Sequence, residues 1–162
     1  MKFSFLRIFI VLALSIVLQS SVVTHALPCG FVPDLLLVVV LLASLRMEGG
    51  PSLILAFLSG LFQDFTSGKY IGPHAAGSVV AVYFLLIISR HIYADRFASL
   101  MLVCFMCTLV KQVVSYLVVF TFLGLESLTL SGSILQIFFI ALISAFIAPL
   151  VSRLLFRSKI KR

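Results

Sequence analysis

Six apolar stretches, separated by short connections, constrain this chain more than any other feature of its sequence. They cover residues 8–27, 31–45, 50–65, 72–89, 97–123 and 133–152. A helix needs about 20 apolar residues to cross about 30 Å of hydrocarbon, where backbone groups must pair within their own segment. The chain is 62% hydrophobic and 10% charged, which is far more apolar than a soluble domain. We therefore predict an all-α, polytopic membrane helix bundle of about six transmembrane helices, with residues 1–162 forming a single integral membrane domain.

Two of the six stretches allow a second interpretation. The stretch 8–27 has a short basic start and ends in Ala26-Leu27-Pro28-Cys29, which is also typical of a cleaved leader peptide. We favour a retained helix, because the stretch is long enough to span and its removal would leave an odd number of crossings. The stretch 50–65 is marginal in length, so a re-entrant segment is the alternative to a full crossing.

The basic residues lie at the ends of the apolar stretches and predict an orientation. With the N-terminus inside and six crossings, most of the 12 Lys and Arg residues face the cytoplasm: Lys2, Arg7, Arg46, Arg90, Arg96, Arg153, Arg157, Lys159, Lys161 and Arg162. Lys69 alone lies outside, and Lys111 lies within a stretch. This asymmetry follows the positive-inside rule and places both termini in the cytoplasm. The net charge of +7 thus indicates topology and contact with anionic membrane lipids, and we expect no nucleic-acid partner.

The connection between the third and fourth stretches contains a compact polar motif. Asp64 ends an apolar stretch, and Gly68 and Gly72 then indicate a turn before the next helix. Small residues four apart, such as Ala56 and Gly60, let helix backbones approach closely in lipid. We predict a tight helical hairpin in which Asp64 accepts hydrogen bonds from free backbone amides or from Ser67. The alternative is a polar pocket or a partner-docking corner.

Two further charged residues stand out. Asp34 follows Pro33 at the start of the second stretch, where a carboxylate suits a helix N-cap and the helix dipole. Lys111 lies near the middle of the stretch 97–123, and an intramembrane charge is a candidate functional residue. We predict that Lys111 is buried against another helix, on a polar stripe with Thr108, Gln112 and Ser115. Snorkelling of the ammonium to an interface is the alternative.

The sequence gives no positive support for catalysis, a cofactor or a metal. His25, His74 and His91 are scattered and lack the spacing of a metal-binding helix. No serine has a His and an acid at recognisable spacing. Cys104 and Cys107 form a C-x-x-C within an apolar stretch, where we expect two small buried side chains and no redox or zinc site.

A family resemblance rests on two segments. The segment Phe31-Val32-Pro33-Asp34 is similar to a proline-plus-acid entry to a second helix. The residues Gly60, Asp64, Ser67, Gly68 and Gly72 resemble the G-x-x-x-D-x-x-S-G…G signature of the rod shape-determining protein MreD family. Length, basic tail and short loops also match, although the specific motif occupies only residues 33–77.

The resemblance implies a role without catalysis. The expected protein is a non-catalytic scaffold of the bacterial elongation machinery in the cytoplasmic membrane. It would act in rod-shape determination and in the regulation of peptidoglycan synthesis, beside MreC, a protein with a single membrane span. Further partners would be the actin-like MreB and cell-wall synthases of the RodA and penicillin-binding type. The implied fold is similar to the substrate-binding subunits of energy-coupling-factor transporters. The alternative function is therefore a subunit that binds a vitamin-type small molecule.

The same resemblance suggested a test of the motif. We predict that co-purification with a single-span partner depends on Gly60 and its neighbours, and that Gly60→Leu breaks it without unfolding the bundle.

Overall fold

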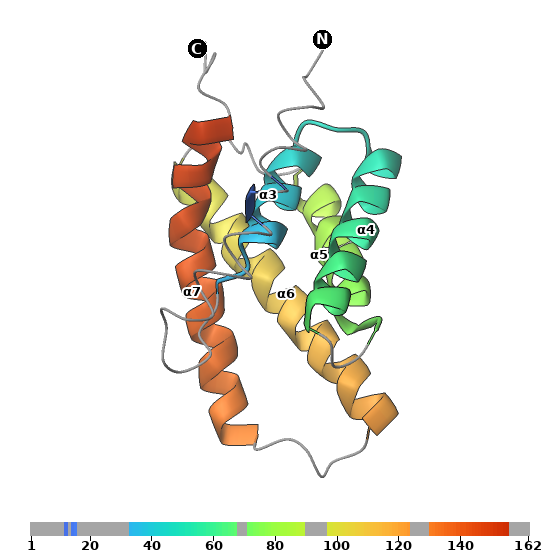
Figure 1. Ribbon diagram of the computed structural model, residues 1–162. Helices are drawn as coiled ribbons and strands as arrows, with labels where there is room; N and C mark the ends of the chain where they lie inside the picture. Colours follow the sequence, from blue (N-terminus) through green and yellow to red (C-terminus); the bar gives the residue numbers. More distant parts are fainter. Residues whose placement is uncertain are drawn as a thin grey trace.

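A computed structural model shows a bundle of helices (Figure 1). It describes residues 12, 14, 15, 33–67, 71–89, 97–123 and 130–155. Its long helices are α3 (Leu35–Ser44), α4 (Gly49–Ser67), α5 (Pro73–Ile88), α6 (Phe97–Leu123) and α7 (Leu130–Leu155). Throughout these ranges every regular element is a helix, which confirms the predicted all-α class. Of the expected stretch 8–27, only Leu12, Leu14 and Ser15 are described.

The helices differ from the expected stretches mainly at their ends. Helix α6 begins and ends where the apolar stretch 97–123 does, because that stretch contains no proline and Lys111 is its only charged residue. Helices α6 and α7 are each long and apolar enough to cross a membrane. Helix α3 has 10 residues and is shorter than the expected 31–45, because it begins only after its N-cap, Asp34. At 1.5 Å per residue it rises about 15 Å, roughly half the hydrocarbon thickness.

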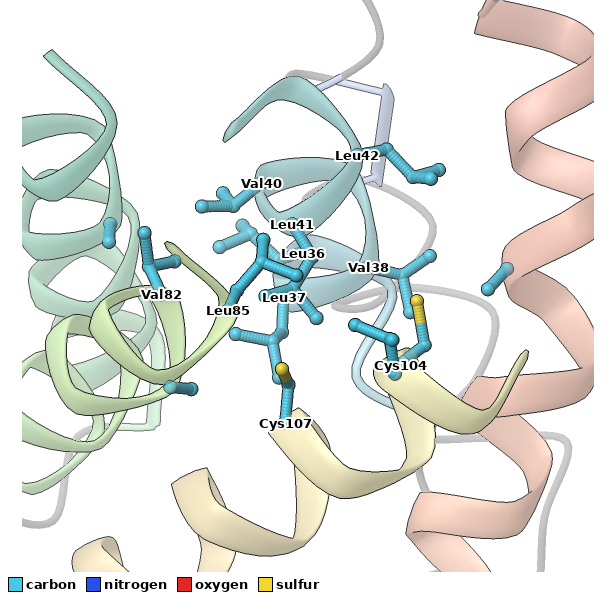
Figure 2. Packing of buried hydrophobic residues seen from close by; sticks show 14 of the residues in the cluster. Leu36, Leu37, Val38, Val40, Leu41, Leu42, Val82, Leu85, Cys104 and Cys107 are labelled. Atoms are coloured by element: carbon cyan, nitrogen blue, oxygen red, sulfur yellow. The ribbon is translucent and has the colours of Figure 1, made fainter. Parts of the chain in front are cut away.

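Helix α3 occupies the centre of the bundle. All residues from Leu36 to Ser44 are buried, on every side of the helix. The helix contacts α4, α5, α6 and α7 (Figure 1). Figure 2 shows its leucines and valines beside Val82 and Leu85 of α5 and Cys104 and Cys107 of α6. A helix that is apolar all round is stable only when it is covered on all sides, so the other helices surround α3.

The surrounding helices follow one another in antiparallel order, with α4 against α5, α5 against α6 and α6 against α7. The start of α4 lies beside the end of α5, where Gly49 approaches Leu86. The guanidinium carbon of Arg153 near the end of α7 lies 4.9 Å from the centre of the Phe97 ring at the start of α6. From there α6 runs diagonally and ends well away from the start of α7 (Figure 1).

Helix α4 shows how side chains are distributed between the inside and the outside. Its buried face carries small and polar residues, namely Ser52, Ala56, Ser59, Gly60 and Asp64. Its exposed face carries large apolar residues, namely Ile54, Phe57, Leu58, Phe62 and Phe65. A soluble protein arranges its helices the other way round. The helix therefore suits a lipid environment, in which packing and hydrogen bonds hold helices together.

Candidate functional site

Lys111 is the centre of a buried polar group of residues. Its side chain is fully buried, with an exposed fraction of 0%. The ammonium forms an ion pair with the carboxylate of Asp34, and its Nζ donates to Oε1 of Gln63 at 2.6 Å. Lys111 is thus enclosed between α6, α3 and α4, as expected from its position in an apolar stretch. The snorkelling alternative is wrong, because the ammonium stays inside the bundle.

Asp34 has two functions at once. It is the N-cap of α3, and its Oδ1 accepts the backbone N–H of Leu37 at 3.1 Å, as the sequence predicted. The same Oδ1 accepts Nε2 of Gln63 at 3.3 Å, and the backbone N–H of Asp34 donates to Oγ of Ser144 at 3.1 Å. The residues Asp34, Gln63, Lys111 and Ser144, here called the polar centre, therefore join α3, α4, α6 and α7.

The polar centre is electrically balanced, which explains how a lysine is tolerated there. Moving a single charge into an apolar interior costs several kcal/mol, and an ion pair with further hydrogen bonds compensates for that cost. The side-chain amide of Gln63 bonds to both members of the ion pair: its oxygen accepts from Lys111 and its nitrogen donates to Asp34. Sequence reasoning did not identify Gln63 or Ser144 as members of this group.

Asp64 organises the turn that joins α4 to α5. Its Oδ2 accepts the backbone N–H groups of Gly72 and Ala75 at 2.9 and 3.1 Å, and its Oδ1 accepts that of His74 at 3.0 Å. These amides are the free donors of the first turn of α5, where a carboxylate also faces the positive end of the helix dipole. The predicted bonds to backbone amides are confirmed. Ser67 instead donates to the main-chain carbonyl of Asp64, at 2.9 Å.

The geometry of this turn favours a structural role for Asp64 over a polar pocket. Asp64 is only 1% exposed, and its carboxylate oxygens face three backbone donors. Gly72 precedes α5 with a φ of 121°, a conformation that glycine adopts without strain, and Pro73 takes the first helical position. Gly68, which the motif also contains, lies outside the described residues.

Two glycines allow the helices on either side of α5 to approach it closely. A Cβ atom on Gly60 would lie 2.5 Å from Cα of Ala75, and one on Gly77 would lie 2.7 Å from the carbonyl oxygen of Lys111. Both clashes involve backbone atoms, which cannot move aside. Gly60 therefore contacts α5 of its own chain. A leucine at this position is therefore expected to disturb the bundle itself, and the dependence of partner co-purification on this region stays a prediction.

The remaining candidate residues have modest roles. Pro33 is buried next to the polar centre. Cys104 and Cys107 are free thiols buried against α3, which confirms their interpretation as small core side chains. Among the residues with a described position, no group of three His, Cys, Asp or Glu side chains could hold a metal ion.

Comparison with known families gives one match. The sequence model of the rod shape-determining protein MreD family matches residues 1–158. The chain belongs to this family. No curated protein and no solved structure matches the chain, so the implied likeness to energy-coupling-factor transporter subunits stays a prediction. Membership in the MreD family assigns the chain to rod-shape determination, a role not associated with a known enzyme activity.

The structure now gives a physical meaning to the MreD-like motif in this chain. Gly60 and Gly72 provide a close helix approach and a turn, and Asp64 holds the first turn of α5. Gln63, the neighbour of Asp64, contacts Lys111 and Asp34. The motif thus connects the α4–α5 turn to the polar centre through two consecutive residues of α4.

Proposed function

We propose that this chain is a non-catalytic scaffold of the cell-elongation machinery, embedded in the bacterial cytoplasmic membrane. It would cross the membrane six times with both termini in the cytoplasm. It would hold partners of the machinery in place and thereby regulate peptidoglycan synthesis. The proposal rests on membership in the MreD family and on the charge asymmetry of the sequence.

The observation that best supports a scaffold is that the buried polar groups bond to other groups of the same chain. Asp34, Gln63 and Lys111 bond to one another, and Asp64 bonds to backbone amides. A binding site for a small molecule would instead present several polar groups to a cavity. Here the strongest polar groups hold helices together, so we infer that their function is to fix the shape of the bundle.

A scaffold of this shape would recognise partners through its outward side chains. These are large and apolar on α6 and α7 as well as on α4, for example Met106, Phe138 and Phe146. They suit the membrane helix of a single-span partner similar to MreC. Contacts with an MreB-like filament, and with synthases of the RodA and penicillin-binding type, would involve the basic cytoplasmic ends or the same membrane faces.

Depletion of the chain from its rod-shaped host tests this proposal. We expect cells to lose their rod shape within a few generations and to regain it when the wild-type chain is supplied. We also expect the affinity-tagged chain to co-purify with an MreC-like single-span protein from mild detergent. Depleted cells that stay rod-shaped but require an added vitamin, together with binding of that vitamin by the purified chain, would instead identify a transporter subunit.

A further inference from the structure

The end of the bundle at which α4 ends and α5 begins, which is the outer end in the proposed orientation, is not level. Oγ of Ser115 donates to the carbonyl oxygen of Pro73 at 3.0 Å, which places the first residue of α5 beside Ser115 of α6. Helix α6 then continues to Leu123. At 1.5 Å per residue this extension adds about 12 Å along the axis of α6. Figure 1 shows α6 extending beyond the end of α4 and the start of α5.

The opposite ends of the helices lie closer to one level. From the contact between Pro73 and Ser115, α5 runs 15 residues to Ile88 and α6 runs back 18 residues to Phe97, a difference of about 4.5 Å at 1.5 Å per residue. Leu100 near the start of α6 belongs to the apolar cluster around α3. Leu86 near the end of α5 and Val151 near the end of α7 pack against the same cluster. Phe97 and Arg153 are in contact at this end as well. The difference in length between the α4–α5 side and α6 therefore appears at the outer end.

The apolar surface on the α4–α5 side is short. On α4, the large exposed apolar residues extend from Ile54 to Phe65, and the exposed Thr66 and Ser67 follow. At 1.5 Å per residue this surface is about 17 Å long, against about 30 Å of hydrocarbon in a typical bilayer. Helix α5, with 16 residues, reaches about 24 Å.

The part of α6 beyond Ser115 is apolar. It is stable only if acyl chains cover it, and it extends further outward than the start of α5. Leu117 and Phe122 are 62% and 83% exposed there. A flat outer leaflet that covers Phe122 would also cover the polar end of α4. A flat leaflet that ends at the α4–α5 turn would leave Phe122 in water. Neither arrangement suits both sides of the molecule.

We propose that the outer leaflet is thinned beside the α4–α5 hairpin, so that lipid headgroups meet the turn while acyl chains cover the end of α6. Bilayers adapt in this way to short apolar surfaces at a modest cost per ångström. The partner of this surface is thus the lipid bilayer itself, in a locally thinner form.

Single tryptophans can test the depth of the two surfaces, because the chain contains no tryptophan. Phe65 and Leu117 are both 62% exposed, and the contacts of Asp64 and Ser115 place them at a similar level of the bundle. Leu117 is two residues beyond Ser115, about 200° around the helix, and so faces away from α5. We would reconstitute the full-length variants Phe65→Trp and Leu117→Trp in phosphatidylcholine vesicles with lipids brominated at a shallow or a deep acyl position.

We expect the ratio of shallow to deep quenching to be several-fold higher at position 65 than at position 117. Equal ratios would mean a flat leaflet and would overturn the proposal. Strong quenching at 117 with none at 65 would mean that protein covers the hairpin, which overturns it as well. If either first variant is not monodisperse, Ile71→Trp and Phe122→Trp, at 67% and 83% exposure, form a second outward-facing pair. Position 122 lies about 10 Å further out along α6 than position 71, so a flat leaflet would give the higher shallow-to-deep ratio at 122 and would overturn the proposal, whereas a ratio at 71 at least as high as at 122 supports it.

Discussion

Replacing Lys111 by leucine is expected to remove most of the folded protein from the membrane. The substitution leaves the carboxylate of Asp34 buried, at 3% exposure, without its cation. Breaking one side of a buried ion pair costs about 3–5 kcal/mol, a large part of the stability of an ordinary domain. The measurement is the amount of monodisperse protein extracted from membranes, together with its thermal unfolding midpoint in detergent.

A second substitution distinguishes loss of charge balance from loss of packing. In the double variant Asp34→Asn with Lys111→Leu, asparagine can still cap α3 and no charge remains in the polar centre. We expect this variant to recover most of the extracted protein. Gln112→Leu changes the neighbouring, partly buried residue and should behave like the wild type. The polar centre would lose its assigned role if Lys111→Leu accumulated normally, or if the double variant were no better than the single one.

Replacing Gly60 by leucine should disrupt the α4–α5 hairpin itself. A Cβ atom at this position would lie 2.5 Å from Cα of Ala75 and 2.6 Å from the carbonyl oxygen of His74. Overpacking of a tight contact costs about 1–3 kcal/mol, and more where backbone atoms must move. We expect a fall in the thermal unfolding midpoint and in the extracted amount, with Gly60→Ala showing a smaller fall in the same direction.

Gly50 on the same helix provides the matched control for this prediction. A Cβ atom on Gly50 would meet nothing within 4 Å, so Gly50→Leu should unfold close to the wild-type midpoint. Equal falls at positions 50 and 60 would point to a general effect of a large side chain on α4 and would contradict the close approach of α4 to α5 at Gly60, because helix propensity alone favours leucine over glycine. A Gly60→Leu protein that kept the wild-type midpoint but no longer co-purified with its single-span partner would instead support a direct role of Gly60 in partner binding.

The sequence predicted the long helices well and the central helix less well. A long apolar stretch with Lys111 as its only charge sets the ends of α6, so hydropathy alone is sufficient there. Helix α3 ended up shorter than its apolar stretch, because Asp34 begins the helix four residues into the segment 31–45. Hydropathy also could not show that α3 lies at the centre, since a buried helix and a lipid-facing helix have the same composition.

The candidate site could be predicted only in part, because its local contacts follow from nearby sequence and its long-range contacts do not. Local turn chemistry identified Asp64 and Asp34 as caps, because both act on amides close to them in sequence. The ion pair of Asp34 with Lys111 joins residues separated by 77 positions, and no local pattern encodes it. A useful signal was present, however. Among the apolar stretches, a lysine within one and an aspartate entering another are natural candidates to neutralise each other.

The direct test of the whole account is the side of the membrane on which the connections lie. Reporter domains would be placed after Arg46, after Ser127 and after Arg162, one active only in the cytoplasm and one active only outside it. We expect a cytoplasmic signal at Arg46 and Arg162 and an external signal at Ser127. The same compartment for Ser127 and Arg162 would contradict the topology, and with it the lipid-facing surface and the scaffold proposed here.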